Sequence, residues 1–480
     1  MTFELSNLLT LLPETVLLGL TCAILIADLF IPQRSRLVTY LMAQTALVVT
    51  LLLILTGFAD NRAVILSGTF VRDTVGDVLK IAVLLATFVT FLYARDYLRA
   101  RNIFRGEYYV LGLFGVLGMM ILISAHSLLT IYLGLELLSL SMYAMVVLQR
   151  DSSLASEAAM KYFVLGAIAS GMLLYGMSML YGVTGSLDLT AIAEALQAGQ
   201  APGVILSFGL VFILIGVGFK LGAVPFHMWI PDVYHGAPTA VTLYIGGAPK
   251  IAAFAMLLRL LVEGMPGLHE HWQAILVVLA VLSMALGNVL AIAQTNIKRM
   301  FAYSTISHVG FLVLGVLTGT DSGVASSLFY TLTYVLMSVA GFGMILFLSR
   351  QGFEADELDD YKGLNQRSPW YAGLMLVIMF SMAGVPPFLG FWAKLAVLEQ
   401  VVAAGMTWLA VLGVVFSIIG AFYYLRLVKL MYFDKPKDTS PLNLNMEMRM
   451  VLSLNSLAIL YLGVFPGGLL ALCQSAILSS

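Results

Sequence analysis

Long apolar stretches of about 20 residues, separated by short polar segments, run along almost the whole of this 480-residue chain. A membrane-spanning helix needs about 20 consecutive, mainly apolar residues. The pattern therefore predicts an all-α membrane protein of about 14 transmembrane helices, which we number helices 1 to 14 in chain order. They cover residues 9–30, 37–58, 75–94, 108–124, 127–148, 158–181, 203–224, 239–262, 272–294, 300–318, 323–348, 370–402, 408–433 and 451–472.

The composition agrees with a protein whose surroundings are lipid. Hydrophobic residues make up 60% of the chain and charged residues only 11%, whereas a soluble domain is about 45–50% apolar and about 25% charged. The formal net charge of −1 lacks the basic excess of a nucleic-acid-binding protein. Cys22 and Cys473 stand far apart, so their spacing supports neither a metal site nor a disulfide framework.

The distribution of basic residues predicts the orientation, because cytoplasmic loops are enriched in lysine and arginine. With both termini placed outside, the outer loops carry only Arg62, Arg72 and Arg259. The loops then predicted to be cytoplasmic carry Arg34, Arg36, Arg95, Arg99, Arg101, Arg105, Arg150, Lys298, Arg299, Arg350, Lys362, Arg367, Arg426, Lys429, Lys435, Lys437 and Arg449.

A short motif occurs twice, five helices apart. Helix 7 ends in GAVPF at 222–226, and helix 12 contains AGVPPF at 383–388. An odd repeat length places two copies in opposite membrane orientations, as in transporters built from inverted repeats; chance similarity of short motifs is the alternative. Because proline breaks the helical hydrogen-bond ladder, we expect helices 7 and 12 to be discontinuous and to line a hydrophilic path.

Five lysines fall inside the predicted spans, at Lys80, Lys161, Lys220, Lys250 and Lys394. Each costs about 2.5–3.5 kcal/mol at the centre of a bilayer, so each needs a reason. Lys220, at the end of helix 7, is either a titratable site in a wet cavity or a side chain that reaches the interface. Lys250 lies too deep for that, and Lys394 is either functional or interfacial.

Glu136, in the middle of helix 5, is the candidate partner of Lys220, either as a switch for proton release or as a static buried ion pair. Lys80 and Lys161 are weaker candidates, because pairing with Asp77 and Glu157 on the same helix faces explains them equally well.

Histidines are the remaining candidates. His227 and His235 are placed in the loop after helix 7, and His308 within helix 10. Their spacing does not predict a metal site. His308 is either a proton relay or a hydrogen-bonded core histidine. No glycine-rich nucleotide loop follows a strand, so we expect no NADH or flavin site in this chain.

Three stretches resemble the antiporter-like subunits of respiratory complex I and of multisubunit cation/proton antiporters. They are FKLGAVPFHMWIPD at 219–232 with GAPT at 236–239, NIKR at 296–299 with YSTISH at 303–308, and SEAAMKYF at 156–163. The resemblance covers roughly helices 4 to 13. Within the family the chain is most similar to the subunit N group of bacterial NADH–quinone oxidoreductases, since helix 12 carries Lys394 where subunit M has a glutamate, and no long lateral helix follows helix 14 as in subunit L.

The resemblance implies two inverted five-helix repeats, of helices 4–8 and 9–13. It divides the chain into 1–107, 108–265, 266–433 and 434–480. It also implies one proton route per subunit, with Glu136 and Lys220 as the pair, Lys250 as central relay and Lys394 as terminal relay; Lys161, His227 and His308 are secondary candidates.

The resemblance further implies a complex in the bacterial inner membrane, with both termini on the periplasmic side. Quinone, FMN and iron–sulfur clusters would be bound by other subunits, and none by this chain. The expected neighbours are subunits M, K and J and the peripheral NADH-oxidising arm. A multisubunit cation/proton antiporter is the alternative function, and a structural subunit whose lysines only dock neighbours is a third.

Overall fold

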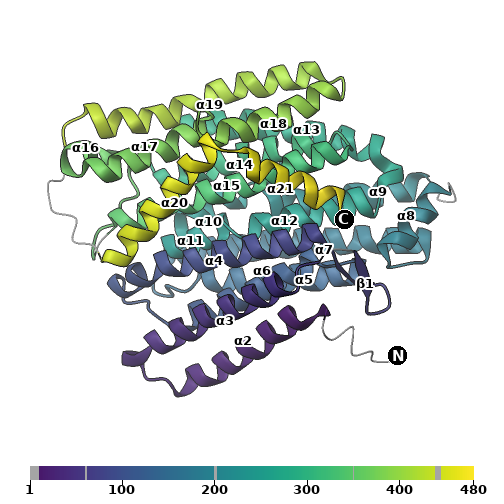
Figure 1. Cartoon of the computed structure of the whole chain (residues 1–480), viewed down its shortest axis with the longest axis horizontal. Coiled ribbons are helices and arrows are strands. Elements are labelled where there is room, and N and C mark those ends of the chain that lie inside the picture. The colour runs from purple at the N-terminus through teal and green to yellow at the C-terminus, as the bar shows by residue number, and fades with distance from the viewer. Residues whose placement is uncertain (1–9, 60–61, 199–202, 350, 438–444, 480) are drawn as a thin grey trace.

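The computed structural model describes residues 10–59, 62–198, 203–349, 351–437 and 445–479, and this part of the chain is almost wholly helical. Figure 1 shows the helices packed as one bundle with their axes running mostly across the view. The predicted start of helix 1 at position 9, and Arg350, lie outside the described residues.

The first quarter of the chain supplies three spanning helices and a small hairpin that the all-helical prediction did not include. The hairpin pairs β1 with β2 in antiparallel register, Val64 opposite Val71. The elements are α2 (Leu12–Phe30), η1 (Gln33–Ser35), α3 (Leu37–Thr56), β1 (Ala63–Ile65), β2 (Phe70–Arg72) and α4 (Thr74–Ala100).

The next segment corresponds to predicted helices 4 to 8. It comprises α5 (Gly106–Ile123), α6 (Leu128–Val146), α7 (Ser153–Thr184), α8 (Leu189–Gln197), α9 (Gly203–Leu221), α10 (Trp229–Gly236), α11 (Thr239–Gly246), α12 (Pro249–Leu257) and the π-helical η2 (Leu258–Glu263). The short α8 was not predicted, because its nine residues fall between two spans.

The remaining segment corresponds to predicted helices 9 to 14. It comprises η3 (Pro266–Leu268), α13 (His269–Ile292), α14 (Ile297–Val316), α15 (Asp321–Leu348), η4 (Leu358–Tyr361), α16 (Leu364–Arg367), α17 (Pro369–Ala383), α18 (Leu389–Ala403), α19 (Thr407–Phe433), α20 (Met446–Val464) and α21 (Gly467–Leu478).

Among the described residues, 13 helices are long and apolar enough to cross a membrane. Predicted helix 12 is absent from that set because it consists of two halves, α17 and α18, of 15 residues each. Counting the two halves as one crossing accounts for the prediction of about 14 spans.

Four predicted helices are interrupted in the structure, and only two of them were expected. Helix 7 ends at Leu221 and resumes as α10, and helix 12 breaks between α17 and α18, as predicted. Helix 8 is also broken, between Gly246 and Pro249, and helix 14 is broken between α20 and α21. The sequence signals were Pro249 and Pro466, which remove a backbone donor just where each second half begins.

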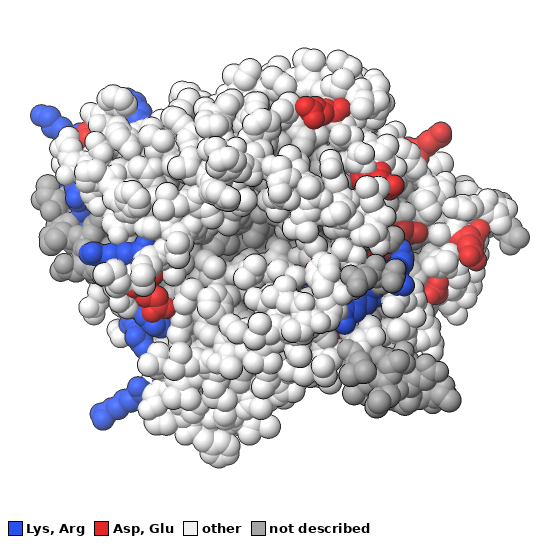
Figure 2. Space-filling model, in the orientation of Figure 1, with Lys and Arg blue, Asp and Glu red and all other residues white. Residues whose placement is uncertain are grey.

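The charged side chains gather at the two ends of the bundle. In Figure 2 most of the visible lysines and arginines lie on the left, and most of the visible acidic residues lie on the right. The beginning of α2 and the end of α21 both lie toward the right-hand, acidic end in Figure 1.

Three basic and histidine positions differ from the predicted loops. Arg259 lies in the buried π-helical end of helix 8. Lys298 is buried in the first turn of α14. His235 belongs to α10. Only Lys298 reflects a shifted boundary, because α14 begins three residues before the predicted span. Arg259 already lies within the predicted span of helix 8, and His235 belongs to a short helix that was not predicted.

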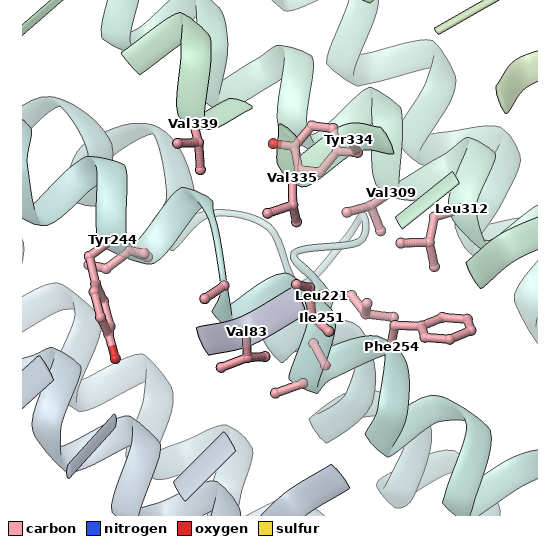
Figure 3. Close-up of a cluster of buried hydrophobic side chains, with 14 of the residues drawn as sticks. Val83, Leu221, Tyr244, Ile251, Phe254, Val309, Leu312, Tyr334, Val335 and Val339 are labelled. Carbon is pink, nitrogen blue, oxygen red and sulfur yellow. The ribbon is translucent and has the colours of Figure 1, made fainter. Parts of the chain in front are cut away.

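The apolar core fills the space where the two halves of the chain meet. Figure 3 shows Leu221, Ile251 and Phe254 from the first half close to Val309 and Leu312 from α14, and all five are buried. Close-packed aliphatic side chains leave little room for water. These apolar side chains therefore form a dry layer at this part of the contact between the two halves.

Candidate functional site

Lys220 stands in the last turn of α9, and its partner is a hydroxyl group. Its Nζ donates a hydrogen bond to Ser139 Oγ on α6 at 2.5 Å. The rings of Tyr143 and Phe219 lie 5.7 and 5.8 Å from the ammonium nitrogen, where an aromatic face attracts a cation. Lys220 thus occupies a buried, mostly aromatic site and has Ser139 as its hydrogen-bond partner.

Glu136 lies near this site but does not bind Lys220 directly. It stands on α6 three residues before Ser139, and the two charged groups interact electrostatically. No Glu136–Lys220 ion pair is present in the described part of the chain, where the buried Glu136 Oε1 has no hydrogen-bond partner. In this structure Lys220 therefore binds a serine that was not predicted, and its pairing with Glu136 stays a prediction.

Lys250 binds the broken end of helix 7. It lies in the first turn of α12 with only 2% of its surface exposed, and its Nζ donates to the carbonyl oxygen of Leu221, the last residue of α9, at 2.8 Å. The last carbonyl groups of a helix lack intrahelical partners, and a cation is stabilised there by the helix dipole. Lys250 therefore caps α9, while the Trp229 ring lies 5.5 Å from its nitrogen.

Lys394 makes the same kind of contact in the second half of the chain. Its Nζ donates to the carbonyl oxygen of Ala383, the last residue of α17, at 2.9 Å, and to Ser417 Oγ at 2.8 Å. It is buried, so the interfacial alternative does not describe its position. Both predicted relay lysines therefore cap a broken helix.

The two breaks also share their backbone conformation. Gly222 and Gly384 follow the last helical residue with φ of +83° and +85°, and the next amide in each case donates to a carbonyl five residues back, Ala223 to Gly218 and Val385 to Phe380. This is a helix end closed by a left-handed glycine.

Gly222→Ala should destabilise the assembled protein. A Cβ at this position would overlap the side chain of Ile230 and lie 3.6 Å from Lys250 Nζ, and the left-handed backbone itself costs about 1–2 kcal/mol for an ordinary residue. Thermal inactivation of the purified complex measures the effect. Gly171→Ala is the matched control, because Gly171 lies in the middle of α7 and nothing lies within 4 Å of the carbon that the substitution adds. Equal midpoint temperatures of inactivation for the two variants would contradict the expectation.

His308 is at the centre of a hydrogen-bonded cluster on α14. Its Nδ1 lies 2.7 Å from Tyr330 Oη, and its Nε2 lies 3.1 Å from Tyr424 Oη. Tyr424 Oη is in turn hydrogen-bonded to Ser304 Oγ. His308 is therefore a buried histidine with hydrogen bonds, as one of the two sequence-based interpretations expected. Because both of its partners are hydroxyl groups, the same contacts also suit a proton relay.

The other candidates lie apart from these groups. Lys161 is 43% exposed at its side chain and pairs with Glu157, as predicted, and also with Asp232. His227 lies in the segment between α9 and α10. Lys80 is buried and pairs with Glu14 at 2.6 Å. The predicted pairing of Lys80 with Asp77 is wrong, because Asp77 binds Arg72.

A small cavity lies between Lys220 and Lys250. It has a volume of about 20 Å³ and is lined by both lysines together with apolar and aromatic side chains that include Met142, Tyr162 and Trp229. A cavity needs roughly 10–15 Å³ to hold one water molecule. The space between the two lysines is thus large enough for a single water molecule.

Sequence reasoning missed the hydroxyl partners Ser139 and Ser417. Serines recur in apolar helices, where they commonly bond the carbonyl four residues back, so nothing in the sequence marks these two. Among the described residues, no cluster of three or more His, Cys, Asp or Glu side chains could hold a metal ion.

Comparisons with known proteins agree on one family. Residues 125–420 match the family model described as NADH:quinone oxidoreductase/Mrp antiporter, transmembrane. The chain is 60% identical to NADH-quinone oxidoreductase subunit N of Thioalkalivibrio sulfidiphilus over 478 residues, covering 99% of this chain and 100% of that protein. It is 57% identical to the subunit N of Thiobacillus denitrificans over 466 residues, covering 97% and 96%.

Solved structures show the same fold. A chain of respiratory complex I from Thermus thermophilus with bound aureothin is 32% identical, with a TM-score of 0.83 over 96% of this chain and 99% of that one. A chain of the Mrp complex from Dietzia sp. has a TM-score of 0.84 at 22% identity, over 99% and 97%, which shows a shared fold.

Proposed function

The chain belongs to the NADH:quinone oxidoreductase/Mrp antiporter family of membrane subunits, and we propose that it carries protons across the membrane along Lys220, Lys250 and Lys394. It is a membrane subunit of an NADH–quinone oxidoreductase complex, so electron transfer from NADH to quinone supplies the energy. Glu136 modulates the first lysine, and His308 is an intermediate relay.

The observation that carries this proposal is that the three proposed relay lysines, Lys220, Lys250 and Lys394, bind neutral groups. Their partners are two serine hydroxyls and two main-chain carbonyls. A buried ammonium without a paired carboxylate is costly, whereas the neutral amine is not. Such a lysine can exist both as the ammonium and as the neutral amine, and a proton relay requires both forms. A static ion pair with a carboxylate would keep the lysine protonated.

The proposed route is continuous in parts and interrupted in one place. One water molecule in the cavity between Lys220 and Lys250 would join the first two lysines. Beyond Lys250, the neighbouring residues Ile251 and Phe254 on its helix and Val309, next to His308 on α14, belong to the apolar core. We infer that a conformational change must admit water there, and that this step is where redox energy acts.

The matching helix ends at Gly222 and Gly384 support two inverted five-helix repeats, helices 4–8 and 9–13, within residues 108–265 and 266–433. Helices 1–3, within residues 1–107, and helix 14, within residues 434–480, would then flank them. In this arrangement each repeat contributes one broken helix whose end is capped by a relay lysine.

The proposed setting is the bacterial inner membrane, with both termini on the periplasmic side. The neighbours would be subunits M, K and J, with FMN and iron–sulfur clusters in the peripheral arm and quinone bound by other subunits. The loops rich in lysine and arginine at one end of the bundle support this orientation.

Lys250→Met tests the proposal in the complete complex reconstituted in vesicles. Methionine fills similar space but cannot carry a proton, so we expect coupled quinone reduction to fall about five- to tenfold with normal assembly. This is less than the roughly 10²–10⁴-fold that a positioned proton-transfer group contributes, because water entering the site would restore part of the transfer. Proton uptake per NADH oxidised is measured with a pH-sensitive dye, and Lys362→Met, on a polar loop, is the control. Full proton uptake per electron in an assembled Lys250→Met complex would overturn the proposal.

The same vesicles separate the alternative functions. A cation/proton antiporter predicts proton flux that depends on sodium. A purely structural subunit predicts that Lys250→Met lowers the amount of complex but leaves activity per assembled complex intact. The proposed relay predicts neither result.

A further inference from the structure

Ser139 binds Lys220 and stands three residues after Glu136 on α6, a position that suits it to control their pairing. It is fully buried. Its hydroxyl donates to the Leu135 carbonyl oxygen on its own helix and accepts from Lys220 Nζ. A serine hydroxyl has one hydrogen, and here the Leu135 carbonyl takes it. Ser139 therefore faces Lys220 only as an acceptor.

Glu136 offers a second acceptor to the same lysine. Residues three apart on a helix are neighbours, so Glu136 and Ser139 lie on one side of α6. The Glu136 Oε1 atom is buried without a hydrogen-bond partner, which is costly for a carboxylate. An ammonium within reach would satisfy it, yet Lys220 is held by the serine.

We propose that Ser139 is a positioning residue that competes with Glu136 for Lys220 and holds the lysine in its unpaired state. The structure shows the serine-bound state. Moving Nζ from Ser139 to Glu136 gives the ion-paired state, in which the proton stays on the lysine; moving it back frees the proton for the cavity shared with Lys250. This inference rests on the proposed proton path.

Ser139→Ala in the complete complex tests this. Without the hydroxyl the lysine should settle on Glu136, so we expect coupled quinone reduction to fall three- to tenfold. A structure of the variant complex should show Lys220 Nζ within about 4 Å of a Glu136 oxygen, the usual limit for an ion pair. Ser139→Thr keeps the hydroxyl and should retain most of the activity.

Ser141→Ala is the matched control. Ser141 is on the same helix, is buried, and also donates to a carbonyl four residues back, that of Leu137. It lacks the contact with Lys220, so its loss should leave activity near that of the unmodified complex. If Ser139→Ala does not assemble, Ser139→Cys keeps a side chain of similar size but replaces the hydroxyl with a thiol, a weak hydrogen-bond acceptor, and is judged by the same two measurements.

Two results would overturn the inference. One is activity of Ser139→Ala equal to that of Ser141→Ala while Lys220→Ala lowers proton uptake as expected. The other is a variant structure in which Lys220 remains away from Glu136. Unchanged proton uptake in Lys220→Ala itself would instead contradict the proposed function, so the two failures are distinguishable.

Discussion

Replacing Lys220 with alanine is expected to lower coupled quinone reduction about tenfold and to reduce the number of protons moved per electron. A positioned proton-transfer group contributes roughly 10²–10⁴-fold, and transient water entering the space left by the side chain would restore part of that. Few neighbouring side chains could take over proton transfer from Lys220, because its contacts include one serine and two aromatic rings. Proton uptake and NADH oxidation, measured together in vesicles, give both quantities.

Lys220→Arg separates the charge of the lysine from its titration. Arginine keeps the positive charge and the hydrogen bond, but its guanidinium does not lose its proton in proteins. A relay therefore predicts that Lys220→Arg is as inactive as Lys220→Ala. If the arginine variant pumps normally, a fixed charge is sufficient and Lys220 is not a relay.

The spans could be predicted from sequence because they depend on a local property, the length of each apolar stretch. The orientation inferred from the arginine-rich loops stays a prediction. The proline-containing motifs at 222–226 and 383–388 correctly marked two broken helices, because proline acts on its own helix. Pro249 carries the same information for helix 8, because it stands where the second half of that helix, α12, begins.

The contacts of the candidate site could not be predicted, because they join residues far apart in the chain. Ser139 and Lys220 are separated by 81 positions, and Ser417 lies on a different helix from Lys394. Lys250 binds a backbone carbonyl, which every residue has and no pattern singles out. The candidate lysines follow from the cost of burying charge, whereas their partners follow only from how the helices pack.

The contacts of Arg259, in another part of the molecule, also join residues far apart in the chain. Of all the substitutions proposed, replacement of Arg259 should have the largest effect on stability. The side chain is 1% exposed and Asp73 is fully buried. Arg259 binds both oxygens of Asp73, at 2.7 and 2.9 Å, donates to the Ile123 carbonyl oxygen at 3.0 Å, and pairs with Glu263. The partner Asp73 also caps the start of α4 through the Gly76 amide. This group joins helix 3, helix 4 and the end of helix 8.

Arg259→Met should cost about 3–5 kcal/mol, because removing one member of a buried pair leaves an uncompensated buried charge. We expect little assembled complex and a clearly lower temperature of thermal inactivation. Adding Asp73→Asn removes the orphaned charge and should recover part of the loss. Arg62→Met is the control, because Arg62 pairs with Glu263 at a more exposed site, where an ion pair contributes about 0–1 kcal/mol. An Arg259→Met complex as stable as Arg62→Met would show that the buried group does not hold these three helices together.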